Sequence, residues 1–226
     1  MEKLDPITME YTLEKKGNLS LIESAPSVRK TALGIHFLLS SVEKDEQAIY
    51  LSFEFDEESL RERILSVASQ IELRKIREDN LSREERKKLA ETKADLALCR
   101  FTIRDMIAPS LSEVIALIEK IHNEGKAEVV IIDYLRLIRN EGKDILKELK
   151  ALAERLNVAV IVLEQIPRGS EGNETDSTYA DAFFLLKRDG EKASLLSLKG
   201  NDKGKEEYLT YNPYTTEFRV VMDNLI

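Results

Sequence analysis

The sequence has little cysteine and histidine, which limits the disulfide and metal chemistry open to it. Its 226 residues contain one cysteine, Cys99, so an internal disulfide is excluded. The two histidines, His36 and His122, do not stand at metal-ligand spacing from that cysteine. We therefore expect Cys99 to be a buried structural thiol and both histidines to be ordinary helix residues.

Long apolar runs are also missing. No stretch approaches the roughly 20 apolar residues that a membrane-spanning helix needs. Residues 1–6 lack the charged-then-apolar pattern of a signal peptide. We therefore expect a cytoplasmic protein with no membrane partner. With 42% hydrophobic and 34% charged side chains, the chain is typical of one globular domain over residues 1–226, of which residues 1–18 form a polar N-terminal extension.

Positive charge is in deficit, since the formal net charge is −8. Proteins that hold nucleic acid by bulk electrostatics usually carry an excess of lysine and arginine. The composition therefore argues against strong general binding of DNA, although 34 lysines and arginines leave room for a local basic patch.

What the sequence does contain is a regular alternation of apolar, strand-like runs with segments of helical periodicity. The expected strands are residues 19–23, 48–55, 100–103, 128–132 and 158–163, and the expected helices begin near 31, 57, 82, 110 and 144. Four closing strands are expected at residues 183–187, 193–199, 207–211 and 218–221, after an exposed and poorly ordered loop at 167–177. This order predicts an α/β fold with a mostly parallel central sheet, flanked by helices, and an antiparallel C-terminal extension.

The loop between the first strand and the first long helix has the layout of a phosphate-binding P-loop. Lys30 and Thr31 open the helix, as in the motif G-x-x-x-x-G-K-[ST]. Both glycine positions of that motif are filled otherwise, by Ser24 and Arg29. The pattern indicates an altered nucleotide site, but an ordinary helix start would also explain Lys30 and Thr31.

Two of the buried strands end on a carboxylate, and a third ends on an amide. Glu54 closes the second strand, Asp133 the fourth and Gln165 follows the fifth. An aspartate at the end of a buried parallel strand, downstream of a P-loop, is typical of the residue that holds Mg²⁺. A strand-ending aspartate can also be a plain helix cap, and this alternative stays open on these residues alone.

These motifs together resemble the C-terminal RecA-type motor domain of DnaB-type replicative helicases, over about residues 17–220. The segments that carry the resemblance are residues 26–32, 51–55, 131–137, 149–157 and 163–168. The resemblance implies a RecA-like fold and the use of ATP and Mg²⁺. It also implies that Ser27, Arg29, Lys30 and Thr31 surround the phosphates, that Thr31 and Asp133 hold Mg²⁺, that Glu54 orients the attacking water, and that Gln165 senses the γ-phosphate.

The chain departs from that family at four places. Arg29 replaces a glycine, and residues 198–204 lack the arginine that acts on a neighbouring subunit, for which Lys199 or Lys203 would substitute only as a point charge. The segment after Arg168 is short, with acidic residues at 169–176. The family's helical N-terminal domain and linker helix have no counterpart in the sequence.

Two functions remain open. One is an active ATP-hydrolysing helicase domain, and the other is a non-catalytic or weakly active paralogue that binds or regulates other proteins of DNA metabolism, with a replicative helicase among the possible partners. A circadian-clock or recombinase relative is a more distant alternative. We favour the paralogue, as a monomer or weak homo-oligomer with weak or no binding to single-stranded DNA. Arg29 would point to solvent or pair inward with Asp133 or Glu54, and we expect inward pairing to weaken ATP binding.

Overall fold

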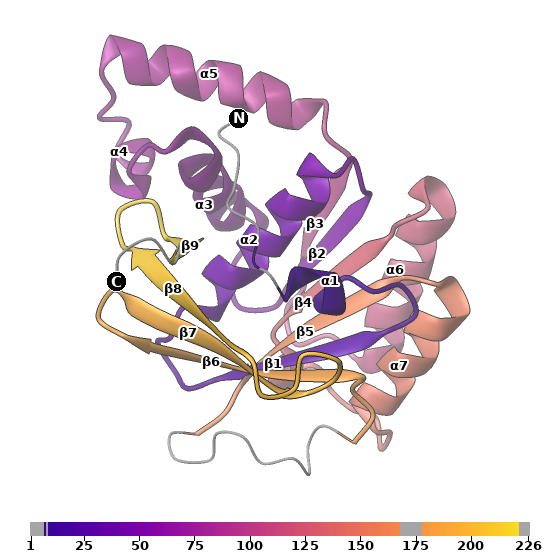
Figure 1. Ribbon diagram of the computed structural model, residues 1–226. Helices are drawn as coiled ribbons and strands as arrows, with labels where there is room; N and C mark the ends of the chain where they lie inside the picture. Colours follow the sequence, from indigo (N-terminus) through magenta and orange to yellow (C-terminus); the bar gives the residue numbers. More distant parts are fainter. Residues whose placement is uncertain (1–6, 8, 168–177, 222–226) are drawn as a thin grey trace.

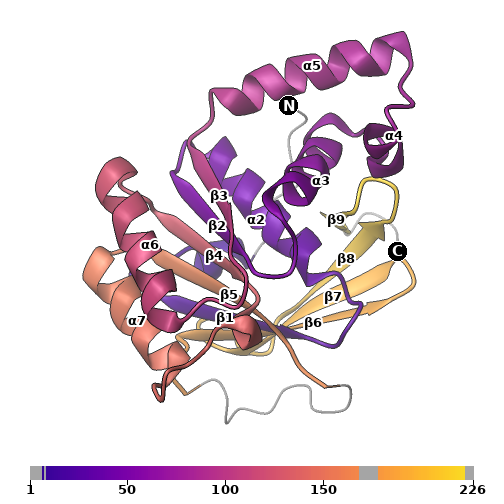
Figure 2. The same ribbon diagram turned by 180° about the vertical axis from the view of Figure 1, so that it is seen from behind.

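One twisted sheet forms the centre of the molecule, and helices cover both of its faces (Figures 1 and 2). The computed structural model describes residue 7, residues 9–167 and residues 178–221. In these residues the nine strands follow the order β3-β2-β4-β5-β1-β6-β7-β8-β9. Strands β1 to β6 pair with one another in parallel, and β6 to β9 continue as antiparallel hairpins. The expected fold class is confirmed.

The strands lie close to their expected positions. Their bounds are β1 Leu19–Ser24, β2 Ala48–Ser52, β3 Phe101–Asp105, β4 Val129–Asp133, β5 Ala159–Gln165, β6 Ala182–Asp189, β7 Lys192–Lys199, β8 Glu206–Asn212 and β9 Glu217–Val220. Strands β1, β2 and β4 are buried along their whole length, which explains their continuous apolar runs.

The helices follow the capping signals of the sequence. Their bounds are α1 Glu10–Leu13, α2 Lys30–Glu43, α3 Glu57–Ser69, α4 Leu73–Arg77, α5 Arg83–Ala97, α6 Leu111–Gly125, the 3₁₀ turn η1 Leu135–Leu137 and α7 Ile145–Leu156. Ser82 and Ser110 each make a capping box, as expected. Helix α3 ends early because Gln70 adopts a left-handed conformation (φ 55°), and the separate helix α4 was not predicted.

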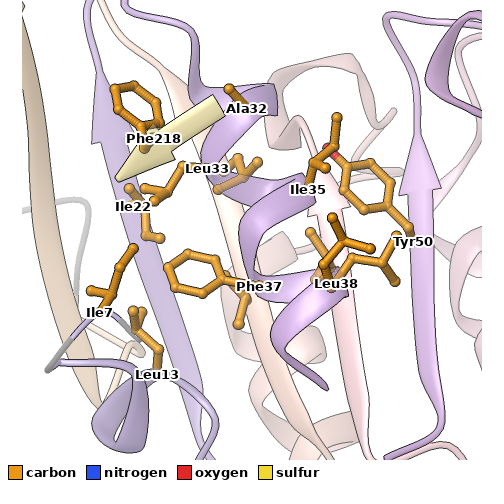
Figure 3. Packing of buried hydrophobic residues seen from close by; sticks show 14 of the residues in the cluster. Ile7, Leu13, Ile22, Ala32, Leu33, Ile35, Phe37, Leu38, Tyr50 and Phe218 are labelled. Carbon is orange, nitrogen blue, oxygen red and sulfur yellow. The ribbon is translucent and has the colours of Figure 1, made fainter. Parts of the chain in front are cut away.

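The core has two layers, one on each face of the sheet. Helix α2 lies on one face, where Leu33 and Phe37 pack with Ile22 of β1 and Phe218 of β9 (Figure 3). Helices α6 and α7 cover the other face, on which Leu149 and Leu152 of α7 are fully buried. The two histidines lie on α2 and α6, as expected.

The N-terminal extension contributes to the core, although its sequence was read as polar. Ile7, Met9 and Leu13 are at most 2% exposed and join the α2 side of the core. The Thr12 hydroxyl also donates to Asp202, in the turn between β7 and β8. This segment is therefore packed between α2 and the antiparallel extension, where no local sequence pattern would place it.

Two smaller expectations concern the thiol and the loop after β5. Cys99 is only partly buried, so the expectation of a buried thiol is wrong, because the residue follows the end of the solvent-facing helix α5. The loop expected to be poorly ordered falls almost entirely on residues 168–177, which lie outside the described part of the chain. In that described part, no helix combines the length and the apolar character required to cross a bilayer.

Candidate functional site

The site lies at the carboxyl edge of the parallel strands, where open α/β sheets bind their ligands. Strand β1 ends at Ser24, and the loop that follows leads directly into α2 at Lys30. Two residues of this loop have left-handed backbone conformations, Ser27 with φ 68° and Arg29 with φ 77°. The loop therefore takes a course that favours glycine, although neither position is a glycine.

Lys30 connects the strand ends that the sequence singled out. Its Nζ atom lies 3.4 Å from Oε2 of Glu54 and 3.2 Å from Oε1 of Gln165. The same ammonium lies 4.1 Å from the centroid of the Tyr134 ring, close enough for a cation–π contact. The Lys30 side chain is 7% exposed, whereas that of Glu54 is 39% exposed. Lys30, Glu54 and Gln165 thus converge, with Glu54 on the solvent side.

Asp133 is the most deeply buried member of the group, with no exposed surface. Burial raises the pKa of its carboxyl group, while the charge of Lys30 and hydrogen bonds from Thr31 and Tyr50 act in the opposite direction. The Tyr50 hydroxyl donates to Oδ2 of Asp133 over 2.9 Å. Oδ1 is buried without a hydrogen-bond partner among the described residues.

The environment of Asp133 fits a magnesium ion. A buried carboxylate oxygen that lacks a partner, next to the hydroxyl of Thr31, is a pair of oxygen ligands of the kind that Mg²⁺ takes beside substrate phosphates and water. The described chain holds no cluster of three or more His, Cys, Asp or Glu side chains that would make an all-protein metal site. Any magnesium here would therefore depend on Thr31, Asp133 and the nucleotide itself.

Arg29 does not pair with either carboxylate, so the inward arrangement considered for it is wrong. Its side chain is exposed, and no ion pair to it occurs in the portion of the chain that the structure describes. Lys30, one residue later, makes the contact to Glu54 instead. The left-handed backbone at Arg29 directs its side chain away from the carboxylates and leaves the space in front of Lys30 open.

That space is a pocket of about 330 Å³ between the P-loop and the end of β2. Besides the expected residues, it is lined by Phe55, Arg63 of α3 and Tyr211 of β8. The Arg63 guanidinium lies 4.5 Å from the Phe55 ring centroid, and its buried Nε has no hydrogen-bond partner in the described chain. Burial lowers the pKa of Arg63, and the nearby charges of Arg77 and Arg29 lower it further. The pocket therefore presents more positive than negative charge.

Arg188 of β6 supports the loop from the other side. Its Nη2 donates to the carbonyl of Ser27 over 3.1 Å, and its guanidinium carbon lies 4.8 Å from the Tyr211 ring centroid. Sequence analysis missed Arg63, Arg188, Tyr50 and Tyr134. A regular helical spacing after Glu54 places Arg63 on α3 but does not aim it at the pocket, and the other three give no local signal.

The turn that follows β7 carries the lysines considered as substitutes for a subunit-bridging arginine. Lys199 donates to the carbonyl of Thr178 over 3.3 Å, and Lys205 pairs with Asp202. Lys203 lies at the tip of this turn. None of these lysines lines the P-loop pocket, so within this chain the turn and the pocket are separate.

Comparison of the sequence with known proteins gives consistent results. The chain is 30% identical over 180 residues to the protein named replicative DNA helicase DnaC of Bacillus subtilis, covering 75% of this chain and 39% of that protein. It is 30% identical over 177 residues to replicative DNA helicase DnaB of Rickettsia typhi, covering 70% of this chain and 36% of that protein. The chain thus spans less than half the length of these relatives.

Solved structures show the same fold. One of them, whose title describes an ATPase domain, superposes with a TM-score of 0.82 at 21% identity, over 92% of this chain and 86% of the other. A DnaB-like replicative helicase, whose title describes its interactions with primase, gives the same TM-score and identity over 92% of this chain and 58% of the other. The family described as "DnaB-like helicase C terminal domain" matches residues 1–180. The chain therefore belongs to the family of DnaB-like helicase C-terminal domains.

Proposed function

We propose that this chain is a nucleotide-binding domain of the DnaB type that binds a magnesium–nucleoside triphosphate in the P-loop pocket but turns it over slowly on its own. One observation carries the proposal: Lys30 contacts Glu54 and Gln165 at the edge of a pocket that Arg29 leaves open. A lysine, a carboxylate and an amide at this edge are the groups that phosphoryl transfer uses for charge stabilisation and positioning.

Each residue has a role that follows from its place. Lys30 would neutralise the outer phosphates, assisted by the N-terminus of α2. Glu54, the most exposed of the group, would orient the attacking water, and Gln165 would contact the γ-phosphate through its amide. Thr31 and Asp133 would hold Mg²⁺, which when bound neutralises charge on the β- and γ-phosphates. Ser27 and Arg29 would border the phosphates, with Arg29 available as an additional cation.

Slow turnover is proposed because the turn between β7 and β8 offers lysines and no arginine. A lysine ammonium is a point charge and does not reproduce the bidentate contacts of a guanidinium. Loss of an arginine finger typically lowers kcat by about 10³–10⁵-fold. Such a domain would act by binding nucleotide and partner proteins, and the names of its relatives make DNA replication, with a replicative helicase as partner, the process to test first.

The alternative is an active motor domain of a hexameric helicase. The contacts among Lys30, Glu54 and Gln165 favour it, because they preserve the groups required for hydrolysis. The two proposals differ in turnover and agree on binding.

Binding is tested by titrating the protein with a fluorescent, non-hydrolysable ATP analogue in the presence of Mg²⁺. We expect saturable binding that Lys30→Ala weakens at least tenfold. Lys187→Ala is the matched control, because Lys187 is an exposed lysine of β6 that does not line the pocket, and it should bind as the native chain does. Equal binding by both variants, or none by the native chain, would refute the proposed site.

A further inference from the structure

Tyr50 is a buried polar side chain next to the proposed magnesium site. It lies in the middle of β2, is fully buried, and points from the sheet toward α2, beside Ile35 and Leu38 (Figure 3). A buried tyrosine hydroxyl usually finds a hydrogen-bond partner, and here the partner is Oδ2 of Asp133, at 2.9 Å. Among the apolar neighbours of Tyr50, the Asp133 carboxylate is the group that its hydroxyl recognises.

The space for the Tyr50 ring depends on Gly34 of α2. A Cβ atom at position 34 would lie 2.8 Å from the Tyr50 hydroxyl oxygen and 2.9 Å from Cδ1 of Leu163. Both distances are shorter than folded proteins allow for such contacts. The absence of a side chain at Gly34 therefore lets the hydroxyl reach Asp133 underneath the first turns of α2.

This hydrogen bond divides the two oxygens of Asp133 between different tasks. Oδ2 is held by Tyr50, while Oδ1 is buried without a partner in the described chain. A carboxylate fixed through one oxygen cannot rotate freely, so the position of the other oxygen is set in advance. Side chains that orient a metal ligand in this way commonly affect metal affinity by about 10–100-fold.

We propose that Tyr50 is a positioning residue that fixes Asp133 through Oδ2 and reserves Oδ1 for the magnesium ion of the bound nucleotide. This inference rests on the proposed nucleotide site. It assigns Tyr50 no contact with the nucleotide, so its effect should appear in the dependence of binding on Mg²⁺.

The test compares Tyr50→Phe with the native chain in titrations of Mg²⁺ at a fixed concentration of the fluorescent, non-hydrolysable ATP analogue. Phenylalanine keeps the ring and removes the hydroxyl. We expect the Mg²⁺ concentration at half-maximal binding to rise about tenfold, while the affinity for the analogue in EDTA stays unchanged. Tyr208→Phe is the control, because Tyr208 is a 61% exposed tyrosine of β8 and its change should shift neither value.

A second pair of variants separates positioning from a general loss of structure. In an Asp133→Asn background, Tyr50→Phe should cause no further rise in the Mg²⁺ requirement, because the hydroxyl acts through the carboxylate. Native-like Mg²⁺ dependence in Tyr50→Phe, or an equal additional shift in the Asp133→Asn background, would overturn the inference while leaving the nucleotide site intact. Absence of binding in the native chain would instead refute the proposed function, and the inference with it.

Discussion

Glu23 of β1 and Glu164 of β5 lie directly opposite each other on neighbouring parallel strands, and both side chains are buried. Glu164 accepts a hydrogen bond from the backbone N–H of Arg136 at 2.9 Å and pairs with the Arg136 side chain at 3.2 Å. Burial nevertheless raises the pKa of Glu164 from 4.5 to about 7, and the charge of Arg136 only partly opposes this effect. An acidic group thus sits under the turn that follows Asp133.

The raised pKa predicts that stability falls as Glu164 ionises. Because the folded-state pKa lies above the unfolded value, the stability linked to Glu164 is fully present below pH 4.5 and is lost as the pH rises through about 7. Glu164→Gln keeps an acceptor for the Arg136 N–H without the charge. We expect it to raise the free energy of unfolding by roughly 1–3 kcal/mol at pH 8 and much less at pH 5. Urea unfolding at both pH values measures this, and an equal effect at both would contradict the prediction.

The backbone at Arg29 predicts a stabilising change in the P-loop. With φ at 77°, Arg29 occupies a region that costs a non-glycine residue energy. Because its side chain is exposed, Arg29→Gly should raise the free energy of unfolding by about 0.5–1 kcal/mol, as the relief of strain exceeds the added entropy of the unfolded chain. Arg29→Ala keeps the Cβ atom and should bring no such gain. Urea midpoints that rank alanine at or above glycine would refute this account of the loop.

Close packing at Gly34 predicts the opposite result for a different glycine. Gly34→Ala should lower the free energy of unfolding by about 1–3 kcal/mol, because the new methyl group meets Tyr50 and Leu163 in a packed core. Gly125→Ala is the control, since Gly125 ends α6 and its nearest neighbour is the flexible side chain of Gln47, 3.2 Å from an added Cβ. Thermal unfolding of both variants distinguishes them, and a stabilised Gly34→Ala would show that α2 has room to move.

Single-stranded DNA should bind weakly to this chain. The net charge is −8, and residues 169–176 include three acidic side chains and no basic one. We expect no saturation of a fluorescent oligonucleotide at micromolar protein and physiological salt, measured by anisotropy. Submicromolar binding under these conditions would mean that a local basic patch outweighs the overall charge.

Much of this fold can be predicted from the sequence, because buried parallel strands leave long apolar runs and capping boxes mark helix starts. The positions of Lys30, Glu54, Asp133 and Gln165 follow from the same rule, since the ends of parallel strands meet at one edge.

The remaining contacts could not be predicted, because they join segments far apart in the chain. Tyr50 looks like any other apolar strand residue until its hydroxyl is placed beside Asp133. Arg188 reaches the P-loop from 161 positions away, and Ile7 enters the core through tertiary packing. The direction of the Arg29 side chain depends on one backbone angle that its neighbours in sequence do not determine.

The most direct test of the proposed function measures ATP binding and ATP turnover side by side on the same native protein. We predict saturable binding that requires Lys30, together with turnover about 10³-fold or more below that of an active motor of this family. Glu54→Gln should leave the binding unchanged. Rapid turnover that Glu54→Gln abolishes would contradict the account and establish an active ATPase, and absence of binding would show that the pocket no longer accepts a nucleotide.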